Sequence, residues 1–237
     1  MRVLLKLSYN GTHYLGSQTQ RETNNTILGQ LELVLKKLSI TSKIIASGRT
    51  DKGVHASGQV CHIDLPEFWS DTAKLKRVLN EMLPSSIYIK KVLPVDDDFH
   101  ARYGAKVRIY RYILKEGEHN PFENDYVTFM KKIDFKKIEK NIELFIGVHD
   151  FSLFMKTGSD TKSPIREIYK AFAYKHKGYI ILNFQANGFL RSQIRLMVGA
   201  LLTLNAIKIQ EKLANIKEHK SKPAPANGLY LARITYE

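Results

Sequence analysis

The hydrophobic residues of the first hundred positions recur with two different periods. A period of two predicts strands, and a spacing of three or four predicts helices that bury one face. These patterns predict strands at 2–9, 43–46, 59–65 and 86–92, and helices at 26–38 and 70–83. The resulting order, β-α-β-β-α-β, is the split arrangement that gives an antiparallel sheet backed by two helices.

The second half shows the same order of elements with longer connections. Strands are predicted at 105–114, 165–176, 179–186 and 228–236, and helices at 134–145 and 190–204. The basic segment 208–222 is expected to form a surface helix or loop. We therefore predict an α+β protein of two ferredoxin-like halves, residues 1–104 and 105–237, each with a largely antiparallel sheet flanked by helices. No residue-level repeat relates the two halves.

The net charge of the chain indicates the class of molecule that it binds. The 237 residues carry a formal net charge of +14, from 37 Lys and Arg against 23 Asp and Glu. There are 14 basic and 10 acidic residues before Gly104, and 23 and 13 from there on, so the halves carry +4 and +10. A field of that sign attracts nucleic acid first and an anionic membrane second. A basic proteome or solubility alone would also account for it.

Cysteine and histidine usage argues against disulfides and metal. Cys61 is the only cysteine, which excludes an intrachain disulfide and a cysteine-rich zinc site and suits a reducing cytoplasm. His55 and His62 are an odd number of positions apart in an extended segment, so they point to opposite faces. The longest apolar stretch, 196–204, is too short to span a bilayer, and the alternating N-terminus lacks a signal-like core. We expect a cytoplasmic protein with no metal and no membrane segment.

A glycine-rich loop at 47–59 joins two of the predicted strands and holds a single carboxylate. Glycine tolerates positive φ and close backbone approach, so its three glycines predict a sharply shaped loop. Asp51 has Arg49 and Lys52 on either side, and neighbouring positive charge favours the ionised carboxylate. Held on a rigid turn, Asp51 is a candidate nucleophile or base. An ordinary turn rich in Gly, Asp and Lys has the same composition.

Two other stretches combine residues that are unusual for a scaffold. Residues 9–20 mix aromatics, amides and glycines, which suits contacts with unpaired bases and equally an ordinary polar loop. In the strand predicted at 105–114, Arg108, Tyr110 and Tyr112 share one face. That face is either a platform for a base and its phosphates or a buried face whose hydroxyls reach water.

A third stretch, 187–199, places two arginines at the start of an apolar helix. Arg191 and Arg195 are one helical turn apart, so they are expected to share a face. An arginine in such a helix usually pairs with a carboxylate or phosphate, although its length also lets it extend to water. The sequence has no Walker loop, no Rossmann glycine fingerprint and no Gly-x-Ser-x-Gly elbow.

Together these stretches resemble the TruA family of tRNA pseudouridine synthases. The family's catalytic signature is similar to the segment Gly48-Arg49-Thr50-Asp51-x-Gly53-Val54-His55-Ala56-x-Gly58-Gln59. Its other motifs are similar, in the same order, to the segments at 9–20, 99–112, 189–199 and 226–231. The likeness covers nearly the whole chain and implies a pseudouridine synthase fold.

The resemblance implies an isomerase that converts uridine to pseudouridine in the anticodon stem-loop of tRNA, at positions 38, 39 and 40. It also implies a homodimer that needs no cofactor and no metal. Asp51 matches the family's catalytic nucleophile, and Tyr110 matches the tyrosine that packs against the target base. Arg195 matches the basic residue that pairs with the aspartate, and Arg49 the arginine thought to enter the RNA and help displace the uridine.

Two positions depart from the family pattern. Ser17 stands where an aromatic residue is usual, and Asn10 stands where an aspartate is usual. The first departure puts local packing or an RNA contact in question, and neither touches the residues of the chemistry. Arg191 falls at a variable family position and is expected to face RNA at most.

Two other classes of function fit parts of the sequence. A non-catalytic RNA-binding module would use the same split sheet with exposed aromatics. A binding surface, however, gains nothing from a carboxylate that faces phosphates. An aspartate-based phosphotransferase or hydrolase would need a metal-binding acidic cluster, whereas the acidic run at 96–98 is contiguous and typical of a solvated turn.

Overall fold

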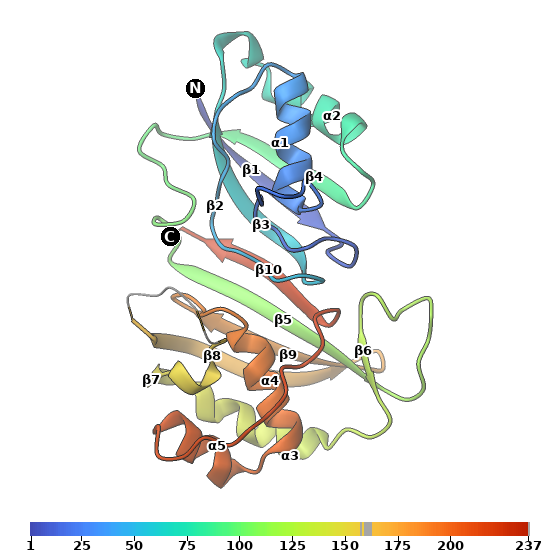
Figure 1. Cartoon of the computed structure of the whole chain (residues 1–237), viewed down its shortest axis with the longest axis vertical. Helices are drawn as coiled ribbons and strands as arrows, with labels where there is room; N and C mark the ends of the chain where they lie inside the picture. The colour runs from blue at the N-terminus through green and yellow to red at the C-terminus, as the bar shows by residue number, and fades with distance from the viewer. Residues whose placement is uncertain (157, 159–162, 237) are drawn as a thin grey trace. The chain divides into compact units, whose positions relative to one another are not determined.

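The structure is a computed structural model that describes residues 1–156, 158 and 163–236. The chain forms two compact units, which Figure 1 shows. The first unit contains Met1–Lys106 together with Tyr230–Glu237, and the second contains Val107–Leu229. Asp51 therefore belongs to the first unit, and Tyr110 and Arg195 belong to the second.

The first unit has the predicted β-α-β-β-α-β order. Its elements are β1 (Arg2–Tyr9), α1 (Ile27–Lys37), β2 (Ile45–Ala46), β3 (His55–Asp64), a 3-10 turn (Glu67–Trp69), α2 (Thr72–Met82) and β4 (Ile87–Pro94). The strands β4, β1 and β3 lie side by side in that order, and β2 pairs with β3. All these pairings are antiparallel, as the split arrangement requires.

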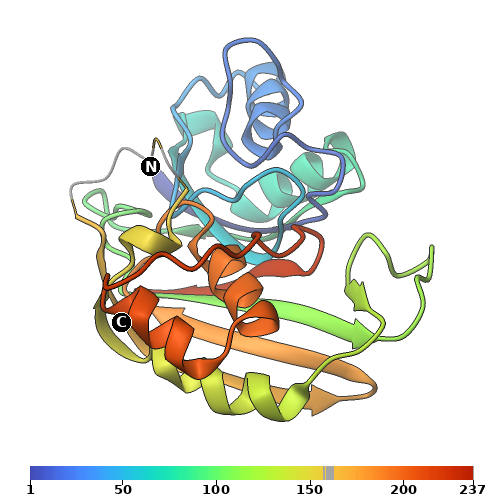
Figure 2. The ribbon, with the colours of Figure 1, turned by 60° about the horizontal axis from the view of Figure 1, so that its bottom comes forward.

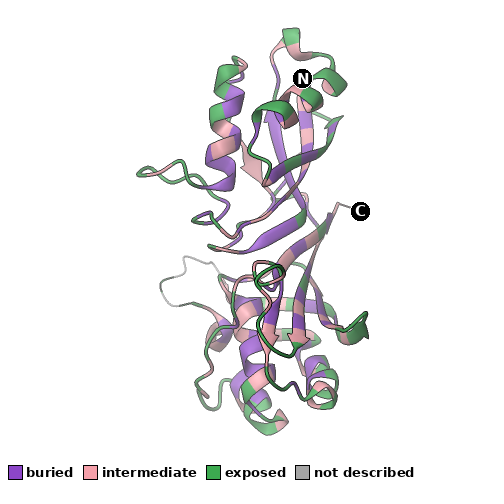
Figure 3. Ribbon diagram, turned by 90° about the vertical axis from the view of Figure 1, so that its right-hand side faces the viewer, coloured by how far each residue is buried: buried purple, intermediate pink, exposed green. Residues whose placement is uncertain are grey.

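The helices of the first unit lie over one face of this sheet, as Figure 1 shows. Alternate residues of β1 are buried, because strand side chains point to opposite faces in turn. The Thr26 hydroxyl caps α1 by accepting a hydrogen bond from the Gly29 N–H at 3.1 Å. Figure 3 shows the result in α1, where buried and exposed residues lie on opposite sides of the helix.

The second unit is also a helix-covered antiparallel sheet with additional short elements. They are β5 (Val107–Glu116), β6 (Thr128–Met130), α3 (Phe135–Asn141), β7 (Gly147–Asp150), β8 (Ile165–His176), β9 (Tyr179–Ala186), α4 (Gln193–Thr203) and α5 (Ala206–Leu213), with 3-10 turns at Ile142–Phe145 and Ser152–Phe154. The sheet order is β5-β9-β8-β7, all antiparallel, and β6 pairs parallel to β5. Figure 2 shows α3, α4 and α5 over one face of this sheet. The predicted α+β class with mostly antiparallel, helix-flanked sheets is confirmed.

The last strand, β10 (Leu229–Thr235), has a partner that the sequence analysis did not predict. Periodicity placed it with the second half, at 228–236. In the structure it runs parallel to β3, with Tyr230 opposite His55 and Leu231 opposite Ala56, so residues from Tyr230 onward group with the first unit. Gly58 allows this approach, because a Cβ there would lie 2.4 Å from the Ala232 carbonyl oxygen.

Three of the differences between predicted and observed boundaries have a clear structural cause. The strand predicted to start at 59 starts at His55, because the end of the glycine-rich loop already pairs with β1. The helix predicted at 134–145 divides into α3 and a 3-10 turn. The helix predicted at 190–204 starts at Gln193, because Ser192 adopts a left-handed conformation with φ 59°. Within the described residues, no helix is both long and apolar enough to cross a membrane.

Gly11 makes a close backbone contact that yields a stability test. A Cβ at Gly11 would lie 2.0 Å from the Val54 carbonyl oxygen, which belongs to the loop that carries Asp51. We expect Gly11→Ala to lower the free energy of unfolding by about 1–3 kcal/mol, since the main chain must move to admit the methyl group. Urea denaturation followed by circular dichroism measures the change.

Gly48→Ala is the matched control for that substitution. A Cβ at Gly48 meets no described atom within 4 Å, and the residue does not have a positive φ. Its free energy of unfolding should stay within about 1 kcal/mol of the wild type. Equal stability of the two variants would show that the Gly11 contact does not constrain the loop.

Candidate functional site

The loop that carries Asp51 connects β2 to β3 and is fixed at its first residues. The Ser47 N–H donates to the Val60 carbonyl at 2.9 Å, and the Ser47 hydroxyl donates to the Gln59 side-chain oxygen at 2.7 Å. The Gln59 amide nitrogen donates in turn to the Gly48 carbonyl at 2.9 Å. Ser47 and Gln59 are buried, so this entry to the loop is a satisfied polar cluster within the first unit.

Thr50, the residue before Asp51, is held by three hydrogen bonds. Its N–H donates to the Ser17 hydroxyl at 2.8 Å, and its carbonyl accepts from the Ser17 N–H at 3.1 Å. Its hydroxyl shares a 2.8 Å hydrogen bond with the Tyr9 hydroxyl. Burial raises the pKa of Tyr9, so this phenol stays neutral at physiological pH. All three residues are buried, which fixes the main chain that enters Asp51.

Asp51 itself begins a tight turn and remains partly exposed. The Val54 N–H donates to the Asp51 carbonyl at 3.1 Å, and Gly53 supplies the positive φ of 77° that the turn needs. Arg49 and Lys52, the neighbouring cations, are exposed. The arrangement presents a carboxylate on a fixed backbone between two solvent-facing positive charges.

The segment 9–20 buttresses this loop. Tyr9 and Ser17 bind Thr50, and the Gly11 N–H donates to His55 Nδ1 at 3.0 Å. The sequence left open whether the segment contacts bases or is an ordinary polar loop. The structure shows a supporting role for its buried residues, and the Gln18 and Gln20 side chains are exposed.

The two departures from the family pattern have structural explanations. Ser17 is 1% exposed and both gives and receives hydrogen bonds with Thr50, so it fills its position as a polar anchor. The Asn10 side-chain oxygen accepts hydrogen bonds from the Thr12 N–H at 3.0 Å and from the Thr12 hydroxyl at 2.7 Å. An aspartate oxygen at this position would accept the same two bonds, so the local turn needs only an oxygen acceptor.

The tyrosine face of β5 carries two buried residues, Tyr110 and Tyr112, with different surroundings. The Tyr112 hydroxyl donates to the Pro225 carbonyl at 2.8 Å and shares a hydrogen bond with the Thr128 hydroxyl at 2.8 Å. Burial raises its pKa, so Tyr112 is a core residue with a satisfied hydroxyl. The Tyr110 ring packs edge-on against Phe189, with centroids 5.2 Å apart. Of the two alternatives for this face, the buried one therefore applies to both tyrosines, with Tyr110 at 9% exposure and Tyr112 at 0%.

Arg195 lies in the first turn of α4 and is fixed by the main chain opposite. Its Nε donates to the Ala224 carbonyl at 2.7 Å, and the Ala224 N–H donates to the Arg195 carbonyl at 2.8 Å. Burial raises the pKa of Tyr112, and the positive charge of Arg195 opposes this rise. Arg195 is therefore within electrostatic reach of the Tyr112 hydroxyl. The guanidinium is thus partly buried beside the tyrosine face of the second unit.

The prediction that Arg191 and Arg195 share a helical face is wrong. Because Ser192 is left-handed and caps α4, Arg191 lies before the helix and is exposed. Its carbonyl accepts a hydrogen bond from the Lys156 N–H at 3.1 Å. A separation of four residues corresponds to one helical turn only when both residues lie in the helix, and α4 begins after Arg191.

His55 is a structural residue, which the sequence analysis excluded from a metal site and included in the segment that resembles the family signature. It is 1% exposed, accepts a hydrogen bond from the Gly11 N–H and stacks on Tyr230 with ring centroids 4.7 Å apart. Its place within the segment 48–59 was the signal that the sequence offered. Among the residues that the structure describes, no group of three or more His, Cys, Asp or Glu is arranged to hold a metal ion.

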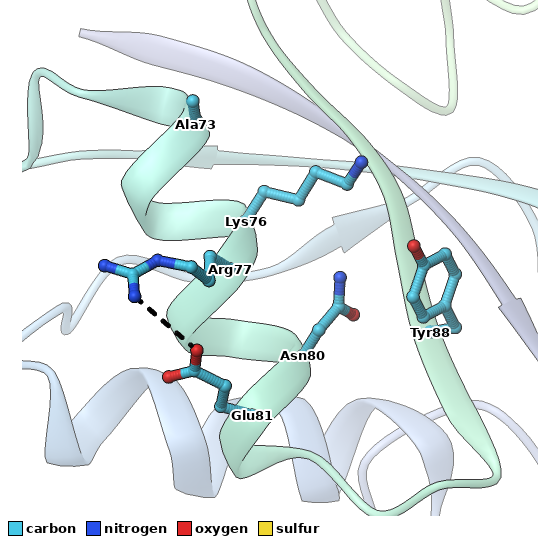
Figure 4. Close-up of a pocket in the computed structure, with 6 residues that line it drawn as sticks. All are labelled: Ala73, Lys76, Arg77, Asn80, Glu81 and Tyr88. Atoms are coloured by element: carbon cyan, nitrogen blue, oxygen red, sulfur yellow. Dashed lines mark ion pairs between the residues drawn. The ribbon is translucent and has the colours of Figure 1, made fainter.

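A hollow of about 490 Å³ lies between α2 and β4, and Figure 4 shows the side chains that line it. They are Ala73, Lys76, Arg77, Asn80, Glu81 and Tyr88. Asn80 makes two hydrogen bonds to the main chain of Ile89, at 2.7 and 3.0 Å, and Arg77 forms an ion pair with Glu81 at 3.8 Å. None of the predicted site residues lines this hollow, and Asn80 joins α2 to β4 there.

Comparison with known proteins identifies the family of this chain. The family profile described as tRNA pseudouridine synthase matches residues 7–104 and 142–237. A tRNA pseudouridine synthase A of Campylobacter jejuni is 39% identical over 100% of both chains. Proteins of the same name from Wolinella succinogenes and Exiguobacterium are each 38% identical, over 99% and 100% of this chain and 94% and 98% of their own lengths.

Among solved structures, the "Crystal Structure of a Cbf5-Nop10-Gar1 Complex" is similar over 84% of this chain and 45% of that chain. Because the sequence identity is 11% and the TM-score is 0.39, this likeness supports no conclusion about the fold or function of the chain. The family match and the full-length relatives are sufficient by themselves. The chain belongs to the tRNA pseudouridine synthase family, whose members are isomerases.

Proposed function

We propose that this protein isomerises uridine to pseudouridine at positions 38, 39 and 40 of the tRNA anticodon stem-loop, with Asp51 as nucleophile and without a cofactor. The observation that carries the proposal is the Asp51 loop. Its main chain is fixed through Thr50, while the Asp51 side chain remains partly exposed. A nucleophile that meets a displaced base needs both a fixed position and access.

The reaction needs a nucleophile but no change in redox state. The N1–C1′ bond of uridine breaks, the base turns, and C5 forms the new bond to C1′. C5 releases its proton and N1 takes one up, so the product is an isomer of uridine. The Asp51 carboxylate attacks either the base or the sugar carbon and leaves again when the new bond forms. The uridine must leave its stack to reach Asp51, and the exposed Arg49 is long enough to enter the vacated space.

Tyr110 and Arg195 would complete the site. Tyr110 would pack against the target base and limit its movement between bond breaking and rejoining, with Phe189 fixing its ring from the side. Arg195 would pair with the Asp51 carboxylate. The anchoring of its Nε by the Ala224 carbonyl supports this role, because a fixed guanidinium loses little freedom when it binds a carboxylate.

We further propose that the protein acts as a homodimer in the cytoplasm. The net charge of +14 suits a tRNA surface larger than the site alone. Cys61 is the only cysteine, so no intrachain disulfide can form, which suits a reducing compartment. The Cys61 side chain is fully buried, and burial raises its pKa to about 12, so this thiol is an unreactive part of the core.

Asp51→Ala tests the nucleophile. Removing the carboxylate should abolish the release of tritium from tRNA that carries 5-tritiated uridine, since no group remains to attack. Binding of tRNA, measured by filter retention, should stay within about threefold of the wild type, because the basic surface is unchanged. Measurable product from the variant would contradict the assignment, and absence of release by the wild type would favour an RNA-binding module.

Arg195→Ala and Arg191→Ala form a matched pair that tests the counter-ion. Loss of Arg195 removes a partly buried, anchored charge and should lower kcat/KM by about a hundredfold, the scale of a lost charged hydrogen bond. Loss of the exposed Arg191 should lower it by less than about threefold. The reverse order of the two effects would assign the role to the wrong arginine.

Chelation separates this proposal from a metal-dependent phosphotransferase or hydrolase. We expect pseudouridine formation to proceed at an unchanged rate in excess EDTA, once the ionic strength is matched. A loss of activity that added Mg²⁺ restores would favour the metal-dependent class.

A further inference from the structure

Arg108 of β5 and Arg166 of β8 both contact the segment that joins β9 to α4. Arg108 Nη1 donates to the Asn187 carbonyl at 2.7 Å. Arg166 lies against Gly188, where a Cβ would be 3.6 Å from its Nε. Since β5 and β8 are the two neighbours of β9, the sheet itself brings these arginines to the same end of that strand.

The two guanidinium groups are close enough to repel each other. Partial burial lowers the pKa of Arg166, and the charge of Arg108 lowers it further. Arg166 is nevertheless held in place, because its Nη1 donates to the carbonyls of Ser163 at 2.9 Å and Ile165 at 2.6 Å. An anion that binds beside both side chains is attracted by two positive charges at once.

The arginine pair adjoins the aromatic pair of the second unit. Phe189, which packs on Tyr110, follows directly after the two residues that Arg108 and Arg166 contact. Arg108 and Tyr110 are two positions apart on β5, so they project from the same face about 7 Å apart. That spacing is within the reach of one nucleotide, with its base at the tyrosine and a phosphate at the arginines.

We propose that Arg166 and Arg108 together bind the backbone phosphate next to the target uridine, and so position the uridine base on Tyr110. This inference rests on the proposed function and adds Arg166, which no sequence motif singled out. A guanidinium is a planar fork that matches a phosphate with two parallel hydrogen bonds. Phosphate contacts of this kind fix the register of RNA without reading its sequence.

A purely structural role would make a different prediction. If the two arginines serve only to pin the segment at Asn187 and Gly188, replacing Arg166 lowers stability and leaves the dependence on RNA charge unchanged. The test therefore has to change charge on both partners. Methylphosphonate linkages provide this on the RNA side, since each removes the charge of one phosphate.

The experiment scans single methylphosphonate linkages around the target uridine of an anticodon stem-loop RNA. For the wild type, one linkage should lower both RNA affinity and kcat/KM by about tenfold or more, the scale of a charged hydrogen bond. In Arg166→Gln the unmodified RNA should already show that loss, and the same linkage should then cost less than about twofold. Arg108→Gln should remove the effect of the same linkage, and Arg166→Lys should keep part of it.

Lys170→Gln is the matched control, because it removes an exposed charge from the same strand. It should keep the full effect of the sensitive linkage. Equal linkage effects in the wild type and Arg166→Gln, with both proteins folded by thermal melting, would overturn the proposal. The comparison of Kd values for modified and unmodified RNA needs no turnover. A wild-type protein that binds unmodified RNA but forms no pseudouridine on it would therefore count against the proposed function alone.

Discussion

The reciprocal hydrogen bonds between Ser17 and Thr50 are the contacts on which the candidate site depends. They join two loops that are far apart in the sequence, and the Tyr9 hydroxyl adds a third bond from β1. All of these groups are buried, so losing one partner leaves a polar group unsatisfied at a cost of about 1–3 kcal/mol. None of the three bonds uses the Asp51 carboxylate. The backbone of the loop is therefore fixed, and its one acidic side chain is partly exposed.

In the second unit, hydrogen bonds to main-chain carbonyls hold the arginine side chains in place. Arg195, Arg108 and Arg166 each donate a hydrogen bond to a main-chain carbonyl, of Ala224, Asn187 and Ser163 respectively. A carbonyl orients a guanidinium without cancelling its formal charge. Arginines held in this way suit an anionic substrate, because their positions are set before binding and little freedom is lost when a phosphate or carboxylate arrives.

The sequence predicted the strands and helices of the first unit, because the apolar residues of Arg2–Tyr9 and Ile27–Lys37 repeat with the periods of a strand and a helix. In the second unit it predicted the long strands and missed the short strands β6 and β7, which are too short to show a period. It could not predict the partner of β10, since pairing depends on which strand edge is open. It misplaced the start of α4, because the left-handed Ser192 has no periodic signal. The Asp51 loop could be found from the sequence, because its glycines, its single aspartate and the flanking cations form a recognisable pattern. The anchoring roles of Ser17 and His55, and the contact of Arg166 with Gly188, appear only when the chain is folded.

Mapping pseudouridine, nucleotide by nucleotide, in an unmodified tRNA transcript after incubation with the purified protein tests the proposed function most directly. Carbodiimide adducts that stop reverse transcription locate each pseudouridine. We expect new stops at positions 38, 39 and 40 wherever that tRNA has uridine, and none with the Asp51→Ala protein. Stops only outside the anticodon stem-loop, or equal stops with both proteins, would contradict the proposed function.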